Sequence, residues 1–382
     1  MSRVAREQKI EDEQKVGKVL RTHAKDSVES IARLCHLTPQ KVARIISNLE
    51  REHQIWGYST VLDDEALGLR HYYLFIRRTN TPLTKAEVET ILFTRLDDIV
   101  SGAVIIENIE ILNGSSDVVF SFFATDIVPA KKFVETFNKK YNKFIQDIHL
   151  YESIYSVRRR GLRNPNIGKN LNLPLVDDSV NIKDLVIRLE HTLVKTSKNP
   201  ITHEEELVAS LLRTHGKDTI DSIAKHCKLS PQKVARIIAK FEREKLIWGY
   251  SAVLDDKEFG HHFYLLSTRT TVPLPKQVVE EILLTRLDDI VPDSDVVLEN
   301  IEYVNGLNDG IFTFFATDIV KAKRFVEIFN NRFHSYMCNF SLLESIYSIR
   351  RRGLRNPNIM TDMVLPLVDD SVNLKDLLKD KN

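Results

Sequence analysis

Apolar residues recur with helical spacing in a stretch near the start of the chain. From residue 38 onward they occupy positions i, i+3, i+4 and i+7, which is the spacing of one buried helical face. They are Val42, Ile45, Ile46 and Leu49. Thr38 can cap this helix, and Pro39 suits its first turn because the amide that proline lacks has no helical partner there. The pattern predicts a helix that begins at Pro39.

The opposite face of this helix carries long hydrogen-bond donors and no carboxylate before Glu50. Its residues are Gln40, Lys41, Arg44, Ser47, Asn48 and Arg51. Such a face suits a helix that lies against phosphates and base edges, although a solvated polar face is the commoner interpretation for an isolated helix. A second copy of the stretch keeps most of these donors, at Gln232, Lys233, Arg236 and Arg243. Because Asn48 becomes Lys240, we expect two recognition helices that do not bind equally.

The whole chain is a tandem repeat. Pro39 matches Pro231 and Trp56 matches Trp248, an offset of 192 in both cases (231 − 39 and 248 − 56). Self-similarity at a fixed offset is the strongest organising signal in a sequence. The 382 residues therefore form two similar units. Each unit is long enough to contain two domains.

The first part of each unit predicts a winged helix-turn-helix domain. A short helix that Asp26 or Ser27 can cap leads through a tight turn at His36 to the donor-rich helix. A strand-like segment, Ile55-Trp56-Gly57-Tyr58, follows and recurs at Ile247. Trp56 and Trp248 stand at the same joint, where we expect them to pack as aromatic anchors.

The second part of each unit changes to strand-like periodicity. In the first unit we expect strands over 71–79, 103–112, 117–125 and 148–157, and helices over 85–99 and 128–144. This order is the βαββαβ ferredoxin-like arrangement, so the fold class is α+β. Both helices cover one face of such a sheet, while the last strands are apolar on both faces. The second unit is the expected partner of the uncovered face.

The expected boundaries follow from these patterns. The helix-turn-helix domains span 1–62 and 202–254, and the ferredoxin-like domains span 63–157 and 255–349. Residues 158–201 form a linker with a basic turn and a helix, and 350–382 form a C-terminal tail. The run Arg158-Arg159-Arg160 could contact phosphates, and a solvated turn beyond a strand is the other interpretation.

Composition limits the partners and the compartment. The net charge of +1 argues against promiscuous nucleic-acid binding, but a sequence-reading protein needs only a local basic face. Three cysteines, Cys35, Cys227 and Cys338, fit a reducing compartment. We find no signal peptide, no membrane-spanning stretch and no metal-ligand spacing, so we expect a cytoplasmic protein without a metal or a cofactor.

The motifs and their order together resemble the Lrp/AsnC family of transcription regulators, in which the second domain is called RAM. The matching segments are Leu37-Thr38-Pro39, Ile55-Trp56-Gly57-Tyr58 and the Gly-x-x-Asp hairpin that begins at Gly114. They recur at Leu229, Ile247 and Gly306, and the resemblance covers about residues 10–157 and 202–349. The chain departs from the family in carrying two units, and in Ile45 and Ile237 where the family often has arginine.

The resemblance implies a DNA-binding regulator that reads an imperfect inverted repeat in double-stranded DNA. The expected DNA contacts are Thr38, Gln40, Lys41, Arg44, Asn48, Ser230, Gln232, Lys233, Arg236 and Lys240. It also implies an amino acid or similar effector at the RAM domains, near Gly114, Asp117, Gly306 and Asp309. As the alternative to effector binding, a tight hairpin favours the same residue types for its own backbone geometry. We expect the RAM domains to associate within the chain, and association between chains stays open.

An enzymatic alternative has the same architecture. Sirohaem decarboxylases are similar, sometimes as a fused double unit, but typically show an Arg-Arg-Phe-Gly-like segment where this chain has Ile-Trp-Gly-Tyr. No nucleophile constellation or phosphate-binding loop is evident in the sequence. From the sequence alone we therefore expect a protein that is not an enzyme and has no catalytic residues.

Overall fold

The computed structural model describes residues 3–88, 104–166, 176–177, 180, 201–283 and 296–359. In each unit, three helices and a strand come first. In the first unit these are α1 (Arg3–Leu20), α2 (Val28–Cys35), α3 (Pro39–Arg51) and β1 (Ile55–Leu62). In the second unit they are α8 (His203–Leu212), α9 (Ile220–Cys227), α10 (Pro231–Arg243) and β7 (Ile247–Leu254). The predicted helix-turn-helix arrangement is confirmed in both units.

Local sequence explains these helix boundaries. Helix α3 begins where predicted, because Oγ1 of Thr38 accepts a hydrogen bond from the amide of Lys41 at 3.3 Å and Pro39 occupies the first turn. Ser230 caps α10 in the same way. Helix α2 ends at His36, which takes a left-handed conformation with φ of 55°. This conformation turns the chain sharply into α3.

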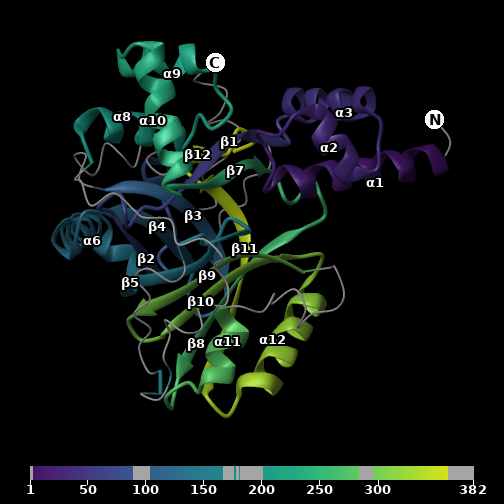
Figure 1. Ribbon diagram of the computed structural model, residues 1–382. Coiled ribbons are helices and arrows are strands. Elements are labelled where there is room, and N and C mark those ends of the chain that lie inside the picture. Colours follow the sequence, from purple (N-terminus) through teal and green to yellow (C-terminus); the bar gives the residue numbers. More distant parts are fainter. Residues whose placement is uncertain are drawn as a thin grey trace.

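The two helix-turn-helix domains are joined by their wings. Strand β1 pairs antiparallel with β7, so the two-stranded sheet contains one strand from each unit. Figure 1 shows this pair between the helices of the two domains and beside the larger sheet. The core of the first domain also takes in Ala252, Leu254 and Phe259 from the second unit. Neither domain is therefore completed by its own unit alone.

The larger sheet is built by the second part of each unit. The first unit contributes β2 (Arg70–Arg78), β3 (Ile105–Asn113), β4 (Val118–Ala124), β5 (Ile145–Arg159) and β6 (Leu162–Arg163), with α6 (Ile127–Tyr141) and the short helix η1 (Asn142–Phe144). The second contributes β8 (His262–Thr270), β9 (Val296–Asn305), β10 (Gly310–Ala316), β11 (Met337–Arg351) and β12 (Leu354–Arg355), with α11 (Lys276–Leu283) and α12 (Ile319–Phe333). Most of the helix predicted over 85–99, and of the helix expected in the linker, lies outside the described residues.

The sheet closes on itself. Its strand order is β11-β3-β4-β2-β5-β9-β10-β8, and β8 pairs back with β11. The seams β5–β9 and β3–β11 join the two units by hydrogen bonds between strand edges. An apolar cluster fills part of the barrel interior, and it consists of Tyr73, Phe75, Leu112, Val119, Tyr151, Leu265, Val304, Ile311 and Leu343. The uncovered faces thus meet inside one barrel, while the helices cover its outside (Figure 1).

No helix of the described part of the chain is long and apolar enough to cross a bilayer.

Candidate functional site

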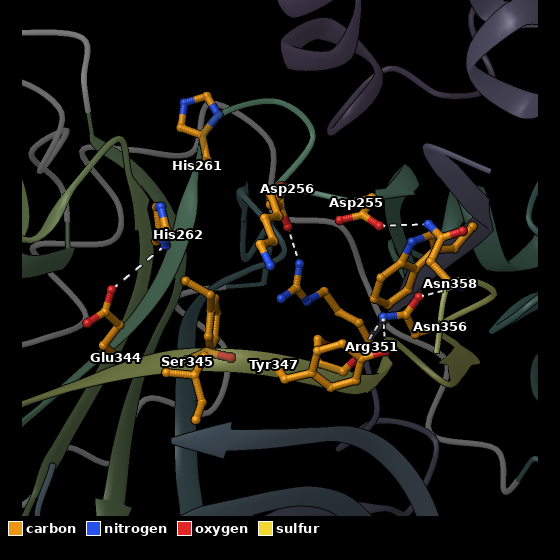
Figure 2. Close-up of a pocket in the computed structure, with 15 residues that line it drawn as sticks. Asp255, Asp256, His261, His262, Glu344, Ser345, Tyr347, Arg351, Asn356 and Asn358 are labelled. Atoms are coloured by element: carbon orange, nitrogen blue, oxygen red, sulfur yellow. Dashed lines mark hydrogen bonds and ion pairs between the residues drawn. The ribbon is translucent and has the colours of Figure 1, made fainter. Parts of the chain in front are cut away.

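Two cavities occupy equivalent places in the two units, where a wing, the acidic segment after the other wing and a long barrel strand meet. The first cavity has a volume of about 670 Å³. Its lining includes Asp63, Asp64, Glu65, Arg70, His71, Glu152, Tyr155, Arg159, Asn164 and Trp248. The second cavity, of about 260 Å³, is drawn in Figure 2. Its lining includes Trp56, Asp255, Asp256, Lys257, His262, Phe263, Glu344, Tyr347, Arg351 and Asn356.

The acidic segment at each cavity anchors the helix-turn-helix domains to the barrel. Asp64 lies directly after β1 and accepts hydrogen bonds from Arg159 at the end of β5 and from Arg213 after α8. Asp64 therefore contacts both units, and it is only 3% exposed. In the other unit, Asp256 accepts from Arg351 and Arg21 in the same manner. Removing one partner of such a buried pair strongly destabilises the folded state, because the other charge is left uncompensated.

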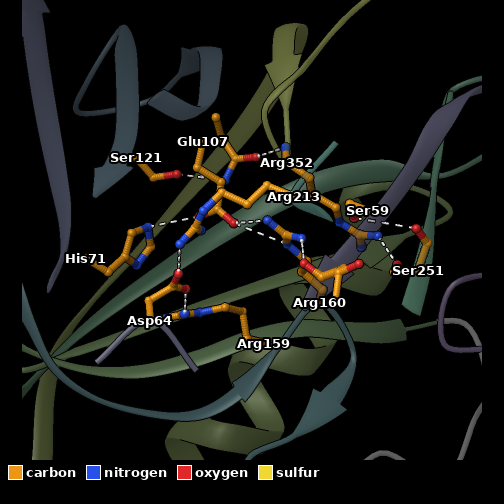
Figure 3. Close-up of polar contacts among 12 residues, drawn as sticks. Ser59, Asp64, His71, Glu107, Ser121, Arg159, Arg160, Arg213, Ser251 and Arg352 are labelled. Carbon is orange, nitrogen blue, oxygen red and sulfur yellow. Dashed lines mark hydrogen bonds and ion pairs between the residues drawn. The ribbon is translucent and has the colours of Figure 1, made fainter. Parts of the chain in front are cut away.

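The wall of the first cavity contains a buried histidine between two carboxylates. Nδ1 of His71 lies 2.9 Å from Oε2 of Glu302, and Nε2 lies 3.1 Å from Oε2 of Glu107. The ring also stacks on Phe123 with 4.8 Å between centroids. Figure 3 shows His71 directed toward the cluster that contains Glu107, Asp64 and the arginines. Glu302 belongs to the second unit, so the site is complete only when both units are present.

The two carboxylates decide the charge of His71. Burial alone lowers the pKa of the ring, but Glu302 and Glu107 outweigh burial and raise the pKa of His71 to about 9. Burial raises the pKa of Glu302, whereas His71 and Arg159 outweigh it and lower that pKa to about 2. At neutral pH the ring is therefore an imidazolium whose Nδ1–H donates to Glu302, while Nε2 lies within ion-pair distance of Glu107.

The second cavity has no such group. By the 192-residue offset, Phe263 stands where the first cavity has His71. The carboxylate that corresponds to Glu302 is Glu110, which accepts hydrogen bonds from Ser345 at 2.6 Å and Ser348 at 2.8 Å instead. Both cavities keep the aspartate, the arginine and the tryptophan. Of the two, only the first has a buried histidine between two carboxylates.

The expected DNA contacts fall into an exposed group and a paired group. Thr38, Gln40, Arg44, Ser230, Gln232 and Arg236 are exposed. The lysines are half-buried and pair with acidic side chains of the first helix of each domain. Lys41 pairs with Asp12, Lys233 with Glu204, and Lys240 with Glu205. Asn48 is also half-buried.

The expected effector residues lie at the barrel seams. Oδ2 of Asp117 accepts the amide of Arg78 at 2.7 Å, and Oδ2 of Asp309 accepts the amide of Thr270 at 2.8 Å. Each aspartate thus ties its hairpin to the neighbouring strand, β2 or β8. A Cβ on Gly114 would lie 2.5 Å from Leu343, and one on Gly306 would lie 2.3 Å from Tyr151. These glycines allow one unit to approach the other closely.

The arginine runs are not solvated turns, and most of their side chains are too buried to contact phosphates. Arg159 and Arg160 are 6% and 4% exposed, and both are paired with buried carboxylates. The sequence marks this run as basic but does not indicate that Asp64 and Glu107 pair with it. It gave no role to His71, because a lone histidine at the start of a strand carries no signal of its partners.

No family model and no curated protein matches the chain, but solved structures do. A sirohaem decarboxylase in complex with an iron-uroporphyrin III analogue is 11% identical, with 89% of this chain and 92% of that chain covered and a TM-score of 0.48. A mutant chlorite dismutase from Candidatus Nitrospira defluvii, in complex with cyanide, is 10% identical over 75% and 95%, with a TM-score of 0.36. An AsnC family transcriptional regulator from Agrobacterium tumefaciens is 18% identical over 46% and 97%, with a TM-score of 0.30. At these identities the likeness is one of fold.

The comparison corrects one expectation. We expected a protein that is not an enzyme, yet the solved structures that match most of the chain are those of enzymes, a sirohaem decarboxylase and chlorite dismutases. The AsnC family regulator matches less than half of the chain. The expectation of a non-enzyme is therefore wrong. It rested on the absence of local motifs, whereas the groups that line the first cavity come from distant parts of both units.

Proposed function

We propose that the protein is an enzyme that acts on a carboxylate-bearing substrate in the first cavity, with His71 as its proton donor. The observation that carries the proposal is the buried imidazolium at the wall of a cavity of about 670 Å³. Buried titratable groups with displaced pKa values beside a cavity are typical of catalytic acids and bases. The reaction class that we infer is decarboxylation, as in the sirohaem decarboxylase alternative.

The chemistry of decarboxylation needs what this wall supplies. Loss of CO₂ breaks a C–C bond and leaves the bonding electron pair on the substrate carbon. That carbon takes a proton, which the imidazolium of His71 can donate. Glu107 and Glu302 then face a neutral ring, and their negative charges favour its reprotonation from water. Because Glu107 and Glu302 lie against both ring nitrogens, neither nitrogen is free to ligate iron, and proton donation to a substrate requires one of these two contacts to open.

The dimensions and lining of the cavity favour a large, flat substrate. Cavities that hold drug-sized ligands and cofactors measure roughly 300–1,000 Å³, and the first cavity lies within that range. Trp248 and Tyr155 supply aromatic surface. Arg70 is exposed at the cavity, where it pairs with Glu152 at 2.5 Å and can exchange this partner for a substrate carboxylate. A tetrapyrrole with several carboxylates, such as sirohaem, has this shape and charge.

The test is turnover of sirohaem by the full chain. We expect a visible absorbance change on binding and loss of CO₂ by mass spectrometry of the tetrapyrrole. His71→Gln keeps a hydrogen-bond donor but no cation, and it should lower the rate by about 100-fold or more while the tetrapyrrole still binds. Phe263→Leu, at the equivalent position of the second cavity, is the matched control and should keep the rate. Equal rates for His71→Gln and wild type, or no binding at all, would refute the proposal.

DNA binding is a second proposal, supported by the exposed donors of α3 and α10. Gln40, Arg44, Gln232 and Arg236 remain exposed after the chain has folded. Replacing Arg44 and Arg236 by alanine should weaken binding to selected DNA fragments at a stated salt concentration. Arg77→Ala, on an exposed barrel position, should not. If the variant with alanine at positions 44 and 236 has the same gel-shift affinity as wild type, these contacts are excluded.

A further inference from the structure

A third cavity of about 370 Å³ lies between the units and has arginines from both of them in its wall. Its charged lining residues are Arg160, Arg213, Arg350, Arg352 and Glu107. Ser210 and Thr214 add hydroxyl groups. Arg160 follows β5 of the first unit, whereas the other arginines belong to the helix-turn-helix domain or the barrel of the second. Among the residues of this wall, four guanidinium groups face one carboxylate.

These arginines are mostly removed from water. Arg160 is 4% exposed, Arg213 is 7% exposed and Arg352 is 3% exposed. Each has a carboxylate partner, but two of those partners do not line the cavity: Asp64 binds Arg213, and Glu299 binds Arg352. Burial lowers the pKa of Arg352, and the charge of Arg160 lowers it further while Glu299 opposes both. Arg160 and Arg352 already donate to protein acceptors, so the wall offers an anion positive charge and the remaining N–H groups of these side chains.

The buried ion network is unbalanced on this side of the molecule. Its cations here are Arg159, Arg160, Arg213 and protonated His71, and its carboxylates are Asp64, Glu107 and Glu302. The equivalent cluster of the repeat contains Arg21, Arg351 and Arg352 with Asp256, Glu110 and Glu299. That cluster is balanced, because Phe263 replaces the histidine. Every cation of the network has a carboxylate contact, so the surplus is one of net charge, and a net positive charge in a buried network favours a bound anion nearby.

We propose that the third cavity binds a small oxyanion, a carboxylate or a phosphate, through Arg160, Arg350 and Arg352. Guanidinium groups offer paired N–H donors that match both kinds of oxyanion. The anion supplies the negative charge that the network on the His71 side lacks. It lies beside Glu107, whose other partner is His71, so the site borders the first cavity without belonging to it.

The test measures binding of inorganic phosphate and of succinate to the full chain by calorimetry, with chloride keeping the ionic strength constant. Binding of phosphate alone identifies a phosphate site, and binding of succinate alone identifies a carboxylate site. Arg350→Gln should weaken binding by about tenfold or more. Arg158→Gln is the matched control, since Arg158 donates to Gly161 O at 2.9 Å as Arg350 donates to Gly353 O at 3.4 Å, but Arg158 does not line the cavity. It should bind the anion as wild type does.

Three further outcomes decide the proposal. His71→Phe removes the surplus cation, so it should also weaken anion binding, with the folded state checked by circular dichroism. Equal affinities for Arg350→Gln and Arg158→Gln would overturn the proposal. So would the absence of binding of both probes to the wild-type chain. Neither outcome depends on turnover in the first cavity, so this inference and the proposed function can fail separately.

Discussion

The charge of His71 is produced by folding. In an unfolded chain a histidine has an ordinary pKa of about 6.5, whereas Glu302 and Glu107 raise the pKa of the folded ring to about 9 against the opposing effect of burial. A group whose pKa rises on folding stabilises the folded state below its unfolded pKa. That stabilisation is lost as the pH rises through the folded pKa. The contribution of His71 to the free energy of unfolding should therefore decline as the pH rises from 6.5 to 9.

The corresponding prediction concerns His71→Phe. The substitution leaves Glu107 and Glu302 without their shared cation, so it should destabilise the protein most at pH 6 and least above pH 9. The difference between these limits should be about 3 kcal/mol. Urea unfolding at both pH values measures it. Phe263→Leu, at the equivalent position of the repeat, removes no titratable group and should show no such dependence, and a destabilisation by His71→Phe that is the same at both pH values would contradict the assigned charge.

Local features of the residues could be predicted from the sequence. The cap at Thr38, the buried face of α3 and the capping serine of α10 follow from spacing and residue type alone, and the structure confirms them. The environment of His71 could not be predicted. Its partner Glu302 is 231 residues away, and nothing local to either residue marks the contact. Arg159 and Arg160 were misjudged for the same reason, because their burial depends on the other unit.

At the scale of elements, the long strands β5 and β11 hold the barrel together. Residues 145–152 of β5 pair with β2 of the same unit, and residues 152–158 pair with β9 of the other. Strand β11 is divided in the same way between β8 and β3. A strand that is apolar on both faces is typical of such a position. The alternation of the sequence predicted a partner, but only the register shows that strand edges and not stacked sheets form the joint.

The close approach at the β5–β9 seam gives a second prediction. A Cβ on Gly306 would lie 2.3 Å from Cδ1 of Tyr151, a ring that is buried in the barrel interior. Gly306→Ala should therefore cost about 1–3 kcal/mol of stability. Thermal unfolding measures the loss. In the double variant with Tyr151→Leu, the alanine should cost less than it does beside tyrosine. If Gly306→Ala melts like wild type, the seam is not packed as described.

For the whole molecule, carrying two units in one chain allows the halves to differ. A symmetric dimer of one unit would have two identical cavities, each with the same residue at the position of His71 and Phe263. Here the first cavity has His71 at this position and the second has Phe263. Both cavities are lined by an aspartate, an arginine and a tryptophan at equivalent positions. The surplus charge beside the third cavity follows from the same difference. The single histidine at this position is thus a consequence of how the duplicated halves diverged.

The last prediction concerns the dependence of each half on the other. Strand pairs β1–β7, β5–β9 and β3–β11 all join the units, and His71, Asp64 and Arg160 find partners that only the assembled chain brings together. Residues 1–180 and 201–382, produced together as separate chains, should therefore purify as a one-to-one complex with the thermal unfolding of a single cooperative unit. Either half alone would expose the apolar barrel interior and the open edges of β3, β5, β9 and β11, and should aggregate or pair with itself. Size-exclusion chromatography with light scattering distinguishes these outcomes, and halves that remain separate, folded monomers would show that the seams do not hold the molecule together.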